Sequence, residues 1–128
     1  MSGMHNPTIM LVEDNRDLQR SIIDLLVHRG YSNIAAFTDA FSAIKYFHSQ
    51  VPDLAILDVE MHGISGLDLL EELKHTIPYL PVILMSSHHD RHIILRACEC
   101  GADTFFPKPF DSELFCRKVE ELLKRVDF

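Results

Sequence analysis

The segment "DLAILDVEMHGISG", residues 53–66, decides which fold this chain can adopt. Its apolar run leads directly to the carboxylate of Asp58, and the chain then breaks into a turn that contains Gly63 and Gly66. A short strand that is apolar on both faces is typical of a parallel sheet covered by helices on both sides. A buried strand that ends in an acidic residue usually ends at a site, so Asp58 is the first candidate functional residue.

Length and composition limit the class of protein. With 128 residues the chain is long enough for one domain with a hydrophobic core and too short for two. The formal net charge of −7 argues against direct nucleic-acid binding, and no apolar run approaches the length of a membrane span. Three cysteines without a signal peptide favour a reducing compartment, so we expect a cytoplasmic protein. We expect residues 1–7 to be a disordered tail or a cloning remnant and residues 8–126 to form the domain.

Apolar runs and amphipathic segments alternate along the whole chain. Each apolar run is short and rich in β-branched or aromatic residues, and each amphipathic segment repeats its apolar residues at helical spacing. The predicted strands are 8–13, 33–37, 54–58, 81–86 and 103–106. The predicted helices are 15–30, 39–48, 66–76, 91–100 and 112–126.

Five strand–helix units in series predict an α/β fold with a doubly wound parallel sheet. In such a sheet the binding crevice lies beyond the carboxyl ends of the strands, where the strand order reverses. We therefore expect the residues that follow the strands to carry the chemistry of this protein.

Polar side chains follow four of the predicted strands. Glu13 and Asp14 end the first strand, Asp58 ends the third, Ser86 ends the fourth, and Lys108 follows the fifth. Three carboxylates placed together repel one another unless a cation is supplied, and an oxygen-only ligand set favours a hard ion such as Mg²⁺. A lysine and a hydroxyl opposite that ion provide what a phosphoryl group needs. The strand ends thus predict a place where a carboxylate meets a phosphoryl group.

Four separate motifs, in the right order, resemble the receiver domain of two-component response regulators. They are "VEDN" (12–15), "LDVEMHGISGLDLL" (57–70), "PVILMSSHHD" (81–90) and "GADTFFPKPF" (101–110), and the resemblance covers roughly residues 7–125. It implies a flavodoxin-like sheet of strand order 2-1-3-4-5 flanked by five helices. It also implies a phosphorelay signalling module that catalyses only its own aspartyl phosphorylation and dephosphorylation, rather than an enzyme.

The resemblance assigns roles to individual residues. Asp58 would take a phosphoryl group from a histidine and form an aspartyl phosphate. Lys108 would bridge to Asp58 and then to the phosphoryl oxygens, and Ser86 would donate its hydroxyl to the phosphoryl group. Phe105 would be the aromatic side chain that turns inward with the switch. That movement would change the face formed by the fourth helix, the fifth strand and the fifth helix.

The resemblance also implies a divalent ion, Mg²⁺ or Mn²⁺. Asp14, Asp58 and the backbone carbonyl of Glu60 would bind it directly, and Glu13 would act through metal-bound water. The side chains of Glu60 and His88 stand at two positions that tune how fast the acyl phosphate hydrolyses. One departure from the family pattern is His62, which replaces the usual proline.

The resemblance implies partners as well. The phosphoryl donor would be a sensor histidine kinase or a histidine phosphotransfer protein, and the output would pass to an unknown partner or effector domain. A homodimer through the face of the fourth helix, fifth strand and fifth helix is a further possibility.

Other interpretations remain open at this point. One alternative is a phosphotransferase or phosphatase with an aspartyl nucleophile, but the chain lacks an Asp-x-Asp motif after the first strand. Another is a degenerate receiver that only binds partners, but the chain keeps all the acids and the lysine. Taken alone, Lys108 is also compatible with a solvated loop residue, Ser86 with a helix cap and Phe105 with a core residue.

Overall fold

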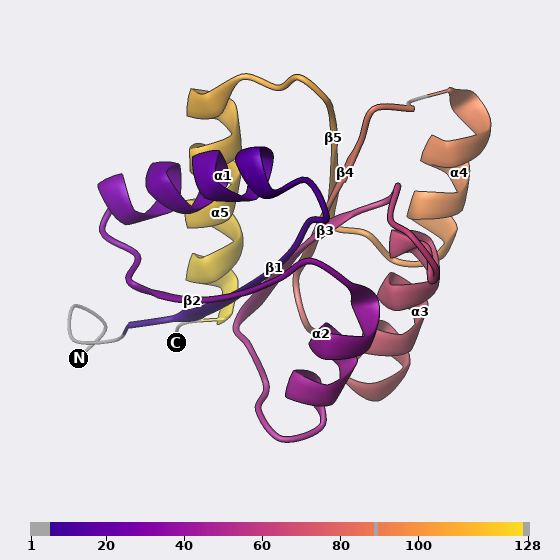
Figure 1. Cartoon of the computed structure of the whole chain (residues 1–128), viewed down its shortest axis with the longest axis horizontal. Coiled ribbons are helices and arrows are strands. Elements are labelled where there is room, and N and C mark those ends of the chain that lie inside the picture. Colours follow the sequence, from indigo (N-terminus) through magenta and orange to yellow (C-terminus); the bar gives the residue numbers. More distant parts are fainter. Residues whose placement is uncertain (1–5, 89, 127–128) are drawn as a thin grey trace.

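A computed structural model of the chain describes residues 6–88 and 90–126, and these form a sheet with helices on both sides (Figure 1). The strands are β1 (Thr8–Val12), β2 (Asn33–Phe37), β3 (Leu54–Asp58), β4 (Val82–Ser86) and β5 (Thr104–Pro107). The helices are α1 (Arg16–His28), α2 (Ala40–Phe47), α3 (Gly66–Thr76), α4 (Arg91–Glu99) and α5 (Ser112–Val126).

The five strands form one parallel sheet with the order β2-β1-β3-β4-β5. This confirms the doubly wound topology predicted from the alternating pattern. The strand order reverses next to β1, because β1 lies between β2 and β3. The crevice expected for such a sheet therefore lies at the carboxyl ends of β1 and β3.

Alternate residues of the central strands pack into two separate cores. Met10, Ala55 and Leu84 face α2, α3 and α4, whose apolar side chains complete the first core. Ile9, Ile56 and other residues of opposite parity face α1 and α5 and form the second core. Figure 1 shows α1 and α5 on one side of the sheet and α2, α3 and α4 on the other. The two-sided burial explains why the strand sequences are continuously apolar.

Side-chain caps explain where the helices begin. Asn15 caps α1 by accepting a hydrogen bond from the Leu18 amide, and Asp39 caps α2 in the same way through the Ser42 amide. Asp90 accepts from the Ile93 amide at the start of α4. The helix ends differ from the sequence-based prediction by up to two residues, and the ends of three strands differ by one, because the pattern of apolar residues does not define the last hydrogen bond of an element.

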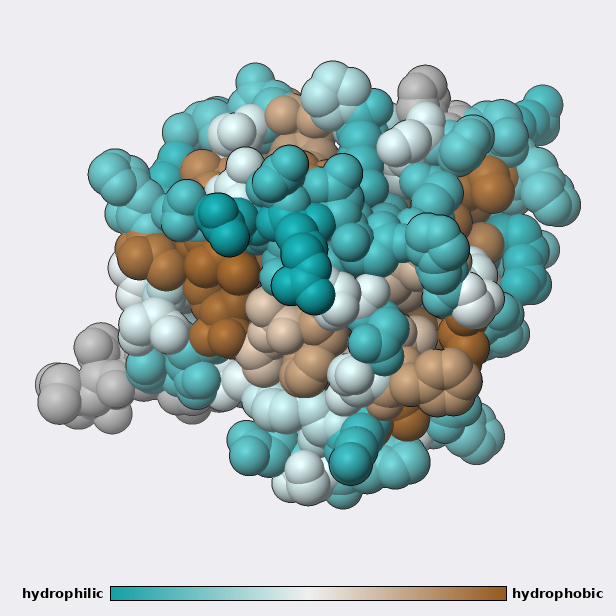
Figure 2. All heavy atoms as spheres, in the orientation of Figure 1, coloured by the Kyte–Doolittle hydropathy of each residue, from teal (hydrophilic) through white to brown (hydrophobic). Residues whose placement is uncertain are grey.

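The face seen in Figure 2 has both hydrophilic and apolar areas, and its apolar side chains gather in several patches. The large apolar side chains that are exposed are Val27, Phe41, Val51, Tyr79, Ile94, Leu95 and Leu114. Among the described residues no helix is both long and apolar enough to cross a membrane. Residues 1–5 of the predicted tail lie outside the described part of the chain, whereas Asn6 donates a hydrogen bond to Ser32.

Candidate functional site

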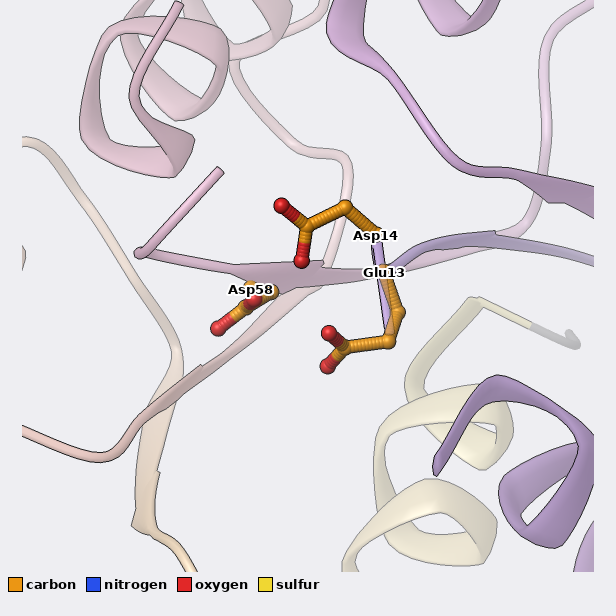
Figure 3. Close-up of side chains that lie close together, drawn as sticks. All are labelled: Glu13, Asp14 and Asp58. Atoms are coloured by element: carbon orange, nitrogen blue, oxygen red, sulfur yellow. The ribbon is translucent and has the colours of Figure 1, made fainter. Parts of the chain in front are cut away.

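Three carboxylates meet at the carboxyl ends of β1 and β3, as the sequence predicted (Figure 3). One oxygen from each of Glu13, Asp14 and Asp58 lies within 4.8 Å of the others. Glu13 and Asp58 are 0% and 1% exposed, whereas Asp14 is partly open to solvent. Two buried carboxylates and one accessible carboxylate thus form a pocket with an open side.

The strand register brings these residues together. Val12 pairs with Leu57 across β1 and β3, so the next residue of each strand reaches the same edge of the sheet. The backbone amide of Glu13 donates to the carbonyl of Phe37, which extends the β1–β2 ladder by one residue. Glu13 and Asp58 therefore project from a rigid scaffold rather than from a mobile loop.

Lys108 places an ammonium group beside the two buried carboxylates of the cluster. Its Nζ atom lies 2.9 Å from Asp58 Oδ1 and 3.1 Å from Glu13 Oε1. The Lys108 amide also donates to the Ser86 carbonyl at 2.8 Å, which holds this end of β5 beside β4. The alternative of a solvated loop lysine is therefore excluded.

The surroundings of Asp58 raise the pKa of its carboxyl group. Burial, opposed in part by the hydrogen bond from Lys108 and reinforced by the charge of Glu13, raises the pKa of Asp58 from 3.8 to about 7. For Lys108, burial favours the neutral amine, but the hydrogen bonds and charges of Asp58 and Glu13 outweigh it and raise the pKa of the ammonium. The pocket therefore holds more negative charge than its single ammonium can neutralise.

The same charge imbalance suits a divalent cation. Glu13 Oε1 and Asp58 Oδ1 are buried, and among the described residues both of these oxygens contact the same Lys108 ammonium. The three residues of the cluster offer only carboxylate oxygens, which hard ions such as Mg²⁺ prefer. The donor set is typical of a magnesium site.

Ser86 is buried at the end of β4, and its hydroxyl bonds to Glu60 rather than to the carboxylate cluster. Ser86 does not cap α4, because Asp90 does so. His88, the other predicted lifetime-tuning residue, places its Nδ1 atom 3.6 Å from Glu60 Oε2. Roles for Glu60 and His88 could be predicted from the sequence, but their contacts with Ser86 could not.

Phe105 pairs with Leu84 across β4 and β5 and is partly buried against the core that includes α3 and α4. Its predicted role as a switch stays a prediction.

His62 forms a contact that the sequence did not indicate. Its Nδ1 atom lies 3.1 Å from Asp14 Oδ2, although the ring itself is fully exposed. These two residues line a cavity of about 270 Å³ together with Glu60 and Met61. The residue that replaces the usual proline therefore stands at the open side of the pocket.

Gly66 is required by the close packing of the turn that follows Asp58. A Cβ atom added at Gly66 would lie 2.0 Å from the backbone oxygen of Asp58 and 2.9 Å from the Val59 Cα atom. Because both atoms belong to the backbone, the turn itself would have to move.

We expect Gly66→Ala to lower the free energy of unfolding by about 1–3 kcal/mol, the usual cost of overpacking. Urea denaturation followed by circular dichroism measures this change. Gly63→Ala is the comparison variant, because an alanine there has the strain of a φ of 83° but meets nothing within 4 Å, so its loss of stability measures the backbone angle without close packing. Equal stability of Gly66→Ala and wild type would show that the turn is not closely packed.

Comparison with known proteins decides the family. The sequence model of the response regulator receiver domain matches residues 9–120. The chain belongs to the response regulator receiver family. The receiver domain is 30% identical over 121 residues to the chemotaxis protein CheY of Pseudomonas aeruginosa, covering 93% of this chain and 98% of that protein.

Two further relatives extend the comparison. The receiver domain is 32% identical over 123 residues to the transcriptional regulatory protein CreB of Escherichia coli, and the aligned region covers 96% of this chain but only 53% of CreB. The chain thus spans about half the length of that relative. A CheY-like receiver domain protein from Methanospirillum hungatei has the same fold, with a TM-score of 0.89, 21% identity and coverage of 94% and 96% of the two chains.

Family membership confirms several expectations. The protein is a two-component response regulator receiver domain, which is a signalling module rather than a classical enzyme. Its acidic pocket is consistent with a phosphorylation site and is typical of a Mg²⁺ site. A receiver domain implies a histidine kinase as partner.

Proposed function

We propose that Asp58 accepts a phosphoryl group from a phosphohistidine of a sensor histidine kinase or a histidine phosphotransfer protein. A carboxylate oxygen of Asp58 would form a bond to phosphorus, the bond from phosphorus to the imidazole nitrogen would break, and the released nitrogen would keep the electron pair. The observation that carries this proposal is the position of Asp58, which is buried at the end of β3 between one ammonium and two further carboxylates.

The residues around Asp58 have separate roles in this proposal. Lys108, already 2.9 Å from Asp58, would stay with the transferred oxygens and offset their charge. Asp14, Asp58 and the backbone carbonyl of Glu60 would hold Mg²⁺ or Mn²⁺ directly, and Glu13 would act through water. When bound, the ion neutralises charge on the transferring phosphoryl group.

The phosphoryl donor needs a docking surface beside Asp58. A cavity of about 430 Å³ lies between α1 and the loop before α5 and is lined in part by Leu18, Ile22, Leu25, Lys108 and Phe110. An apolar helix of the donor would suit this cavity because Leu18, Leu25 and Phe110 line it. Lys108 also lines it and contacts Asp58, so a helix bound there would lie beside the phosphorylation site. We place the donor there, and we place the protein in the cytoplasm, where its three free cysteines would stay reduced.

The output would pass through the face formed by α4, β5 and α5. The Ser86 hydroxyl would donate a hydrogen bond to the phosphoryl group. As Ser86 moves toward that group, the ring of Phe105 would turn inward. Ile94 and Leu95 of α4 and Leu114 of α5 are exposed, which gives an output partner, an effector domain or a second copy of the chain apolar surface to bind on these helices. Glu60 and His88 would set the lifetime of the aspartyl phosphate by orienting or excluding the attacking water.

The direct test is phosphorylation by a small donor such as acetyl phosphate in the presence of Mg²⁺. Intact-mass spectrometry should show one added phosphoryl group on wild type, none on Asp58→Asn, and none on wild type in excess EDTA. A folded wild type that gains no phosphoryl group, or an Asp58→Asn variant that still gains one at the wild-type rate, would overturn the proposal. Asp53→Asn is the matched control, because Asp53 precedes β3 and lies outside the carboxylate cluster.

A further inference from the structure

The side chain of Glu60 accepts hydrogen bonds from the end of β4 and from the loop that follows it. Oε1 of Glu60 accepts a hydrogen bond from the Ser87 amide at 2.8 Å, and Oε2 accepts a short hydrogen bond from the Ser86 hydroxyl. The Nδ1 atom of His88 lies 3.6 Å from the same Oε2. One carboxylate thus contacts three consecutive residues, the last residue of β4 and the first two of the β4–α4 loop, and we call these contacts the Glu60 clamp.

The clamp leaves the Ser86 hydroxyl without a free proton. A serine hydroxyl has one proton to donate, and Ser86 is 0% exposed, so water does not offer an alternative. The same oxygen accepts from the His88 amide at 2.9 Å and lies 2.5 Å from the His88 carbonyl, which is the other acceptor in reach. None of these contacts is with Asp58. The Ser86 hydroxyl must therefore break its present hydrogen bond before it can donate one to a phosphoryl group on Asp58.

We propose that Glu60 is a positioning residue that holds Ser86 and the β4–α4 loop in the resting arrangement. This inference rests on the proposed function, because it assumes that a phosphoryl group on Asp58 competes for the Ser86 hydroxyl. The competition has two parts. A phosphoryl group offers the hydroxyl a charged acceptor, and its negative charge repels the Glu60 carboxylate, which comes from the same segment two residues after Asp58.

The clamp therefore sets the balance between two positions of the loop. If Glu60 stabilises the resting position, part of the binding energy of any phosphoryl group is used to break the clamp. Removing the clamp should then increase the fraction of molecules that are ready to bind, and apparent affinity rises by the same factor.

The test uses beryllofluoride, which mimics the aspartyl phosphate, with amide NMR of wild type, Glu60→Ala and Glu60→Gln in Mg²⁺. In Glu60→Ala without beryllofluoride, the amide signals of Ser87 and Phe105 should move along the line that joins free and beryllofluoride-bound wild type. The apparent dissociation constant for beryllofluoride should fall by about tenfold. Glu60→Gln should show a smaller change, because its amide oxygen still accepts one of the hydrogen bonds.

A matched control separates this role from a simple loss of negative charge. Glu72→Ala removes the same charge from an exposed position on α3 and should leave both readouts at wild-type values. Equal tightening in Glu60→Ala and Glu60→Gln, without movement of Phe105 along the line, would mean that charge alone acts and would overturn the clamp. Unchanged affinity in Glu60→Ala, with wild type still responding to beryllofluoride, would overturn it and leave the proposed function intact. If folded wild type does not respond at all, the proposed function fails and the clamp fails with it.

Discussion

Asp58→Asn should be more stable than wild type above about pH 8 in Mg²⁺-free buffer, by about 2 kcal/mol in the free energy of unfolding. The reason is the pKa of Asp58, which burial raises from 3.8 to about 7. An ionised carboxylate at this site destabilises the folded state, and asparagine keeps the shape of the side chain without the charge. The gain is smaller than the full pKa shift implies, because asparagine also loses the ionic bond to Lys108.

The difference in free energy of unfolding between wild type and Asp58→Asn should change with pH in a defined direction. Below the unfolded pKa of 3.8 the carboxyl group is protonated in both states, so wild type and variant should differ little. Between 3.8 and about 7 the folded state keeps a proton that the unfolded state releases, so wild-type stability should fall as the pH rises through this window. Urea denaturation across this range should show the slope in wild type and not in Asp58→Asn.

Two controls test the cause. Asp24→Asn removes an exposed carboxylate of α1 and should leave the slope unchanged. Saturating Mg²⁺ should stabilise wild type more than Asp58→Asn, because a bound ion favours the charged carboxylate. Parallel pH profiles of wild type and Asp58→Asn would show that the pocket does not disfavour the ionised form.

Removal of the Lys108 ammonium should destabilise the folded protein, whereas Asp58→Asn should stabilise it. In Mg²⁺-free buffer above about pH 8, Lys108→Ala should lower the free energy of unfolding by about 3 kcal/mol, because it leaves buried carboxylates without a cation. Both contacts of Lys108, at 2.9 Å to Asp58 and 3.1 Å to Glu13, would be lost. Carbon-13 NMR of the carboxyl groups should place the pKa of Asp58 above its wild-type value of about 7.

Lys118→Ala is the matched control for this variant. Lys118 pairs with Glu121 at 3.1 Å on the surface of α5, and exposed ion pairs contribute about 0–1 kcal/mol. If Lys108→Ala costs no more than Lys118→Ala, the pocket does not need its ammonium. Combining Lys108→Ala with Asp58→Asn should recover part of the loss, because one of the buried charges is then absent.

Much of the fold could be predicted from the sequence. Strands that are apolar on both faces require two layers of helices, and this requirement selects the parallel, doubly wound arrangement. Glu13 and Asp58 could be assigned to one site because parallel strands end at the same edge of the sheet. Lys108 could be added for the same reason, since it follows β5 by one residue.

Contacts within the loops could not be predicted. Glu60 and Ser86 are in contact although they lie 26 positions apart in the sequence, and His62 and Asp14 lie 48 positions apart. Neither pair belongs to a helix or a strand ladder, so no periodic pattern constrains it. The close approach of Gly66 to the backbone of Asp58 depends equally on the path of the turn.

The residue types at the carboxyl ends of the strands follow from the order of residues, because the alternation of apolar runs and amphipathic segments gives the order of the elements. The behaviour of those residues depends on how the chain folds. The raised pKa of Asp58 arises from burial and from its distances to Lys108 and Glu13, and the hold of Glu60 on Ser86 arises from the path of two loops. Electrostatic interactions and hydrogen bonds depend on distance and solvent access in three dimensions, and the order of residues alone does not specify either.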